Sequence, residues 1–155
     1  MRLGVLVFPC VLGRAGRRAR KREGDGATPL GCLRALRVLY RADRIQRPLT
    51  ALPIRSIARD DGWCDAPCDR NYNRPVRHPY PASAERLWRA DNLYDLIVVL
   101  DHNVRPRARR AGSAIFLHVA RPDRAPTEGC IALRREHLLL LARQLGPGAR
   151  IRIAG

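Results

Sequence analysis

The sequence has almost no lysine, few aromatic residues and no long apolar run. Of its 30 basic residues only Lys21 is a lysine, and aromatic residues make up 5% of the chain. Scarce aromatics leave few platforms on which single-stranded nucleic acid could stack. No stretch reaches the roughly 18 to 20 consecutive apolar residues needed to cross a membrane. We therefore expect neither a stacking nucleic-acid binder nor a membrane span.

The chain also lacks the cysteine and histidine spacing of a zinc site. Cys64 and Cys68 have no second pair at a suitable distance, and the next histidine is His78. The five cysteines are an odd number, so a monomer keeps at least one unpaired. A disulfide between Cys64 and Cys68 is geometrically demanding. Free thiols, no metal and no cofactor are the expectation.

The composition is that of one globular domain over residues 1–155, with 46% hydrophobic and 28% charged residues. The formal net charge is +16, which suits binding to nucleic acid or another polyanion. A GC-rich coding bias also produces arginine in place of lysine, and the arginines extend from Arg2 to Arg152. This second interpretation is favoured, so no nucleic-acid partner is expected, and the protein is expected to be a monomer.

The first thirteen residues superficially resemble a signal peptide, because a short apolar run follows Arg2. They lack a clear small-x-small cleavage site, and Pro9 interrupts the run. A first strand or a truncated start is favoured over a processed signal.

The apolar pattern predicts mostly strands. The expected strands are residues 3–12, 32–41, 94–100, 114–119 and 149–153. A helix is expected over residues 134–145, and a short one is expected to begin at Ser83 with Glu85 in its first turn. Residues 13–29 are expected to form an exposed loop, and residues 60–81 a long functional one. The prediction is a compact, mainly β domain.

Residues 113–133 hold the chemistry that the other segments surround. His118 closes an apolar run, and Cys130 follows Gly129 twelve residues later. A thiol needs a base and donors for an oxyanion, which the amides of Gly129 and Cys130 could supply. The second ring nitrogen of His118 needs an acceptor such as the Val119 carbonyl. The alternatives are a small buried cysteine and a core histidine.

This order of motifs resembles the catalytic domain of YkuD-type L,D-transpeptidases, over about residues 8–153. The resemblance rests on His118, a loop, the sequence Thr-Glu-Gly-Cys-Ile at residues 127–131, and a final helix and strand. The Thr-Pro-Leu-Gly sequence at residues 28–31 is similar to the family's early hairpin, and residues 62–80 resemble a compact subgroup. The resemblance implies a β-sandwich or barrel-like fold with one or two short helices.

The resemblance also implies an activity on peptidoglycan stem peptides. Cys130 would attack a tetrapeptide stem, expel the terminal D-alanine and pass the acyl group from a thioester to an amine, with His118 moving the protons. Transfer to water would instead make the protein a carboxypeptidase or hydrolase, and a catalytically silent, basic polymer-binding homologue is a further alternative. The implied location is the periplasm or cell envelope.

Several residues depart from the family pattern. Ala132 stands where many members have arginine or asparagine, so Arg121, Arg124 and Arg134 are candidates to bind a substrate carboxylate. Glu128 replaces a frequent histidine; it should oppose thiolate formation, or it could hold the ammonium group of a diamino acid. Thr127 is the remaining expected substrate contact. His102 is expected in a solvated turn rather than in the cleft.

Overall fold

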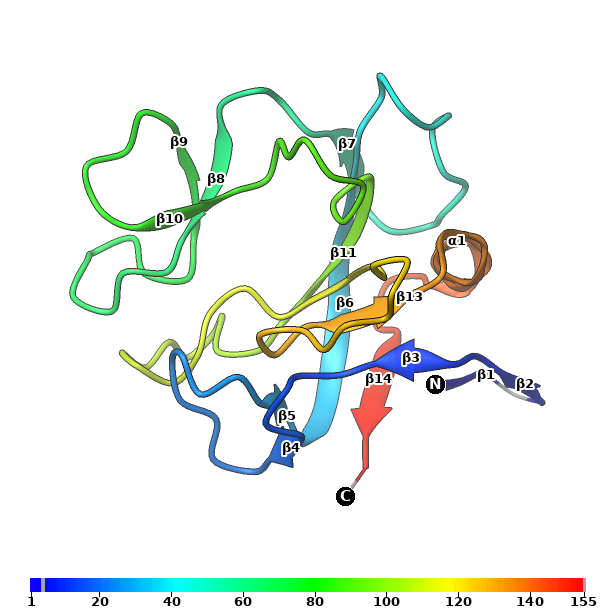
Figure 1. Ribbon diagram of the computed structural model, residues 1–155, viewed down its shortest axis with the longest axis horizontal. Coiled ribbons are helices and arrows are strands. Elements are labelled where there is room, and N and C mark those ends of the chain that lie inside the picture. Colours follow the sequence, from blue (N-terminus) through cyan, green and yellow to red (C-terminus); the bar gives the residue numbers. More distant parts are fainter. Residues whose placement is uncertain (4, 155) are drawn as a thin grey trace.

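The computed structural model describes residues 1–3 and 5–154, and the long strand β6 (Gly31–Tyr40) lies at its centre (Figure 1). β6 belongs to a curled sheet with the strand order β14-β6-β11-β12-β13-β3. The other strands of this order are β14 (Arg150–Ile153), β11 (Leu96–Leu100), β12 (Phe116–Val119), β13 (Ile131–Leu133) and β3 (Cys10–Val11). β7 (Ile54–Ser56) pairs in parallel with the end of β6. The predicted mainly β fold is confirmed.

The two faces of the sheet are covered by different parts of the chain. On one face, the single helix of the described residues, α1 (Arg135–Gln144), buries Leu138 and Leu141 against the sheet. On β12, Leu117 packs in this core, whereas Phe116 packs in a second core with Trp63. Because successive side chains of a strand point to opposite faces, His118 lies on the same face as Phe116. No helix of the described residues is long and apolar enough to cross a membrane.

A small sheet covers the face that carries Phe116. Its strands are β10 (Ala84–Arg86), β8 (Asp61–Cys64) and β9 (Pro75–Arg77), in that order, and they lie apart from the main sheet in Figure 1. Residues 60–81 therefore form a folded wall instead of an unstructured loop. Two further pairs, β1 (Arg2–Leu3) with β2 (Leu6–Val7) and β4 (Arg17–Arg18) with β5 (Thr28–Pro29), complete the strands.

Two predictions of secondary structure are wrong. The helix expected from Ser83 is the strand β10, because Glu85 pairs across from Trp63 in the small sheet. The single strand expected over residues 3–12, of which Gly4 lies outside the described residues, is three short strands. The Pro9 nitrogen has no hydrogen to donate to a ladder, which accounts for an interruption there.

The exposed loop expected over residues 13–29 is buried in its second half. Ala27 and Thr28 are fully buried, and the Thr28 hydroxyl accepts a hydrogen bond from the Gly13 amide at 2.9 Å. The strands expected over residues 32–41, 94–100, 114–119 and 149–153 are present with shifted ends, and so is the long helix. All five cysteines are free.

Candidate active site

A cavity of about 570 Å³ on the Phe116 face of the sheet is lined by both His118 and Cys130. β12 carries His118, and Cys130 is the residue immediately before β13. β12 and β13 are parallel neighbours, with His118 opposite Ala132. The parallel pairing therefore places the two residues, which are twelve positions apart in sequence, on adjacent strands facing one cavity.

The His118 ring is held on two sides. Its Nδ1 lies 2.8 Å from the Val119 carbonyl oxygen, which is the acceptor expected from the sequence. Because a carbonyl can only accept, Nδ1 carries the proton and Nε2 is left as the basic nitrogen. The Tyr94 ring packs edge-on against the imidazole at 5.5 Å. Burial lowers the pKa of His118, against the opposing effect of the Val119 contact, so the imidazole is neutral at neutral pH.

The Cys130 sulfur is also hydrogen-bonded. The Sγ donates to the Ala114 carbonyl at 3.0 Å and accepts from the Phe116 amide at 3.3 Å. Burial raises the pKa of the Cys130 thiol to about 12, and the Glu85 carboxylate adds to this effect. The resting pair is therefore a neutral thiol and a neutral imidazole, so Cys130 could act as a nucleophile only if its thiol lost the proton at the moment of attack.

Thr127 shapes the loop that ends in Cys130. Its hydroxyl donates to the Cys130 carbonyl at 2.6 Å and accepts from the Gly129 amide at 3.1 Å. Gly129 has φ +133°, and a Cβ there would lie 2.8 Å from the Ala27 carbonyl oxygen, so only glycine fits without strain. Because the Gly129 amide points to Thr127, the Cys130 amide is the better placed of the two expected oxyanion donors.

The cavity is also lined by a Glu–Tyr pair that was not predicted from the sequence. The Tyr94 hydroxyl donates to Glu85 at 2.5 Å, and both residues line the cavity. Burial raises the pKa of Glu85, against the effect of the Tyr94 hydrogen bond. The pair joins β10 to the segment before β11, two elements that are separate in sequence. No local pattern signals such a pair.

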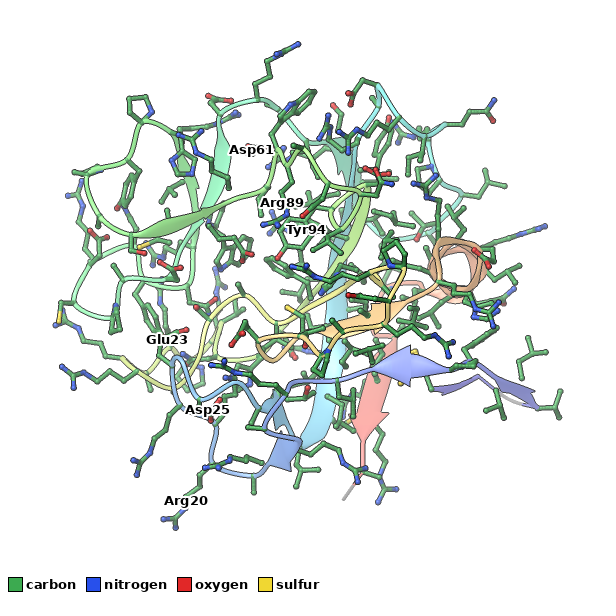
Figure 2. The ribbon with its side chains drawn as sticks, viewed as in Figure 1. Arg20, Glu23, Asp25, Asp61, Arg89 and Tyr94 are labelled. Carbon is green, nitrogen blue, oxygen red and sulfur yellow. The ribbon has the colours of Figure 1, made fainter. Side chains whose placement is uncertain are left out.

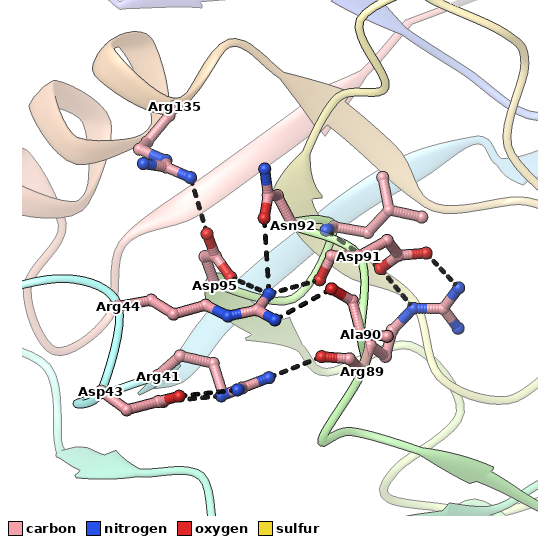
Figure 3. A network of polar contacts seen from close by, with 10 residues as sticks. Arg41, Asp43, Arg44, Arg89, Ala90, Asp91, Asn92, Asp95 and Arg135 are labelled. Carbon is pink, nitrogen blue, oxygen red and sulfur yellow. Dashed lines mark hydrogen bonds and ion pairs between the residues drawn. The ribbon is translucent and has the colours of Figure 1, made fainter.

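A network of ion pairs holds the segment that carries Tyr94 (Figure 3). Asp95 is 1% exposed and accepts from Arg44 at 3.1 Å and from Arg135 at 2.6 Å. The Arg44 guanidinium also donates to the carbonyl oxygens of Ala90 and Asp91. Helix α1 and the loop after β6 thus brace the cavity wall from outside. Figure 2 shows Arg89 and Tyr94 near the centre of the molecule.

The expected substrate-binding residues occupy different places. Arg121 lines the main cavity and also a neighbouring one of about 240 Å³, whereas Arg124 and Arg134 line only the smaller cavity. Glu128 lies at the main cavity but is exposed and paired with Arg14 at 3.2 Å. The acidic residue that raises the pKa of the Cys130 thiol is Glu85, instead of the expected Glu128.

His102 lies apart from both cavities. Its Nε2 contacts the Ala111 carbonyl oxygen at 2.9 Å, and burial lowers the pKa of the ring, so it is a half-buried turn residue and not the solvated one that was expected. Among the described residues, no group of three or more His, Cys, Asp or Glu side chains is placed to hold a metal ion.

These features define a mainly β domain with a cysteine and a histidine facing one cleft. A family model, described as the L,D-transpeptidase catalytic domain (YkuD), matches residues 2–153. This match covers nearly the whole chain, so the protein belongs to the YkuD family. Comparisons with curated proteins and with solved structures found no significant match. The family acts on peptidoglycan and is generally associated with the cell envelope.

Proposed function

We propose that the protein is a cysteine-dependent L,D-transpeptidase that transfers an acyl group from a peptidoglycan tetrapeptide stem to an amine. The observation that carries this proposal is the geometry of His118. Its Nδ1 is tied to Val119, and its remaining basic nitrogen belongs to a residue that lines the same cavity as Cys130.

In the first half-reaction, the Cys130 sulfur attacks the stem carbonyl while His118 Nε2 takes the thiol proton. The carbonyl oxygen becomes an oxyanion, to which the Cys130 amide donates. The bond to the terminal D-alanine then breaks, and His118 returns the proton to the leaving amine. The product on the enzyme is a thioester.

In the second half-reaction, an acceptor amine attacks the thioester and loses a proton to His118. An amide forms, and the thiol of Cys130 is restored. Four acidic residues line the cavity, namely Glu23, Asp65, Glu85 and Glu128, and four basic ones line it as well, namely Lys21, Arg86, Arg89 and Arg121. The acidic side chains offer partners to the ammonium group of a diamino acid, which supports an amine acceptor over water. This ammonium must lose a proton before the neutral amine attacks. Glu128 at the rim would attract the same group.

We place the substrate carboxylate near Arg121. Ala132, where many family members carry a longer polar side chain, is only 2% exposed, between β12 and β3. Arg121 lines both cavities and Arg134 the smaller one. A guanidinium group binds a carboxylate through two parallel hydrogen bonds, so these arginines would replace the missing contact.

The test is incubation with purified tetrapeptide muropeptides, with and without a diamino-acid acceptor, followed by mass spectrometry of both muropeptides and intact protein. Wild type should release D-alanine and gain the mass of the acyl stem, whereas Cys130→Ala should do neither. Cys68→Ala, which removes an exposed thiol, is the matched control and should behave as wild type. Unchanged products with Cys130→Ala would refute the mechanism.

The same experiment separates the alternatives. Products that lack the acceptor but have lost D-alanine identify a carboxypeptidase. A basic polymer-binding protein without catalysis is the second candidate, favoured by the net charge of +16. It predicts salt-sensitive binding to anionic polymer that survives the loss of both His118 and Cys130, and no thioester trapped by a carbapenem.

A further inference from the structure

The only lysine of the chain lies beside the nucleophile loop. The Lys21 side chain is only 4% exposed, and the residue lines the cavity that contains Cys130. Its ammonium donates to Asp25 Oδ1 at 2.5 Å and to the Arg22 carbonyl at 3.0 Å. An ammonium has three N–H donors, and these contacts use two of them. A buried cation of this kind, in a chain whose other basic residues are all arginine, calls for a physical reason.

Two glycines make room for this side chain. A Cβ on Gly129 would lie 3.4 Å from both Cε and Nζ of Lys21, and a Cβ on Gly112 would lie 2.7 Å from its Cγ. Gly129 precedes Cys130, and Gly112 precedes the segment whose Ala114 carbonyl holds the thiol. Lys21 therefore packs between the two backbone segments that hold the sulfur. A planar guanidinium is larger than an ammonium point charge and does not match this space.

Lys21 is also fastened to the loop through Asp25. The same Oδ1 that binds the ammonium accepts a hydrogen bond from the Ala27 amide at 2.9 Å, and the Ala27 carbonyl packs directly on Gly129. The chain of contacts runs from the ammonium to the residue before the nucleophile. A change in the position of Lys21 is thus transmitted to the loop.

The charges around Cys130 have opposing effects. Glu85 disfavours the thiolate, whereas Lys21 favours it and lowers the pKa of the thiol. Tyr94 and neutral His118 face the same cavity, which Arg86, Arg89 and Arg121 also line. Arg89 is paired with Asp91 at 2.6 Å. Lys21 is thus the cation that lies against the nucleophile loop itself.

We propose that Lys21 is a positioning residue for the nucleophile: its fixed ammonium orders the Gly129–Cys130 loop and stabilises the thiolate that Cys130 forms during attack. This proposal rests on Cys130 being the nucleophile of the proposed function. It assigns the single lysine a chemical purpose that the surrounding arginines cannot serve.

The test measures how fast the uncharged reagent iodoacetamide alkylates Cys130 between pH 7 and pH 10. Trypsin should release Cys130 in the peptide of residues 125–134, which contains no other cysteine, so mass spectrometry follows this thiol alone. Lys21→Met keeps the length of the stem but removes the charge. We expect it to slow alkylation at pH 8 about tenfold and to shift the pH profile upward, since one pKa unit is a tenfold change in thiolate.

The matched control is Arg20→Met, which removes one charge from the neighbouring residue, exposed and pointing away from the fold (Figure 2). It should leave the rate within about twofold of wild type because solvent screens the charge. Equal slowing by both variants, or an unchanged rate in folded Lys21→Met, overturns the proposal. If Lys21→Met does not fold, Lys21→Gln replaces it under the same criterion.

Lys21→Arg gives an independent result, because it keeps the charge in a poorer fit. We expect an alkylation profile between those of wild type and Lys21→Met, and a profile equal to wild type refutes the argument that this space requires an ammonium. Alkylation needs no peptidoglycan substrate. If Lys21→Met slows alkylation but the wild-type protein does not turn over muropeptides, the proposed function is refuted. The effect of Lys21 on the Cys130 thiol then still stands.

Discussion

Replacing Asp95 with alanine should destabilise the protein strongly, because two arginines converge on this buried carboxylate. Asp95 is 1% exposed and pairs with Arg44 at 3.1 Å and Arg135 at 2.6 Å. Breaking a buried ion pair costs about 3–5 kcal/mol because the remaining charge loses its partner. The side chains of Arg44 and Arg135 are 27% and 40% exposed, so water compensates in part. We expect a loss of about 3 kcal/mol in the free energy of unfolding.

For a domain of this length, 1 kcal/mol corresponds to roughly 2–4 °C in the unfolding midpoint. Asp95→Ala should therefore lower the midpoint by about 10 °C in thermal unfolding followed by circular dichroism, and urea unfolding should give the matching free energy. Asp60→Ala is the control, since Asp60 pairs with Arg77 at 2.5 Å but both side chains are exposed, at 49% and 61%. Its midpoint should change little. Equal losses in the two variants would refute the argument from burial.

Three further predictions concern the cavity and its walls. Burial opposes ionisation of Asp61, but its arginine contacts outweigh burial and lower the pKa of this carboxyl. Asp61→Asn should therefore lower the free energy of unfolding by about 2 kcal/mol at pH 7. The difference from wild type in urea unfolding should shrink as the pH falls through that lowered pKa. A pH-independent difference would contradict this. Glu85→Gln removes the carboxylate that disfavours the Cys130 thiolate, so alkylation of Cys130 at pH 9 should become about threefold faster, and an equal or slower rate would count against it. Gly129→Ala places a Cβ 2.8 Å from the Ala27 carbonyl oxygen. Muropeptide turnover should fall at least tenfold and the free energy of unfolding by about 2 kcal/mol. A variant that turns over muropeptides as fast as wild type would show that the loop adapts.

The strongly apolar elements were predictable because local patterns specify them. The sequence Leu-Ile-Val-Val-Leu of β11 is buried at every position, and a short β-branched run of this kind is typical of a central strand. The stripe of Leu138, Leu141 and Leu145 likewise predicted α1. Glu85 shows where local reasoning fails. A serine cap followed by an acidic residue favours a helix, but pairing with β8 outweighs this weak preference.

The candidate nucleophile and base could be named from the sequence, but their surroundings could not. A glycine before Cys130 and an apolar run before His118 indicated a nucleophile and a base, and the carbonyl of Val119 was expected as the imidazole acceptor. Lys21 carried a signal as the only lysine, yet it falls in a Gly- and Arg-rich stretch that predicts an exposed loop. Its burial depends on Gly112 and Gly129, which are far from it in sequence.

The sequence by itself determined the apolar central strands, the long helix, the order of the motifs and the family to which the chain belongs, because local patterns of residues specify them. The tertiary structure alone decided what surrounds the thiol. It turned the Gly129 amide toward Thr127 and left Glu128 at the surface. It also brought Glu85, which raises the pKa of the Cys130 thiol, and Lys21, which lowers it, to the same cavity. These effects depend on distance and burial in three dimensions, which no spacing along the chain encodes.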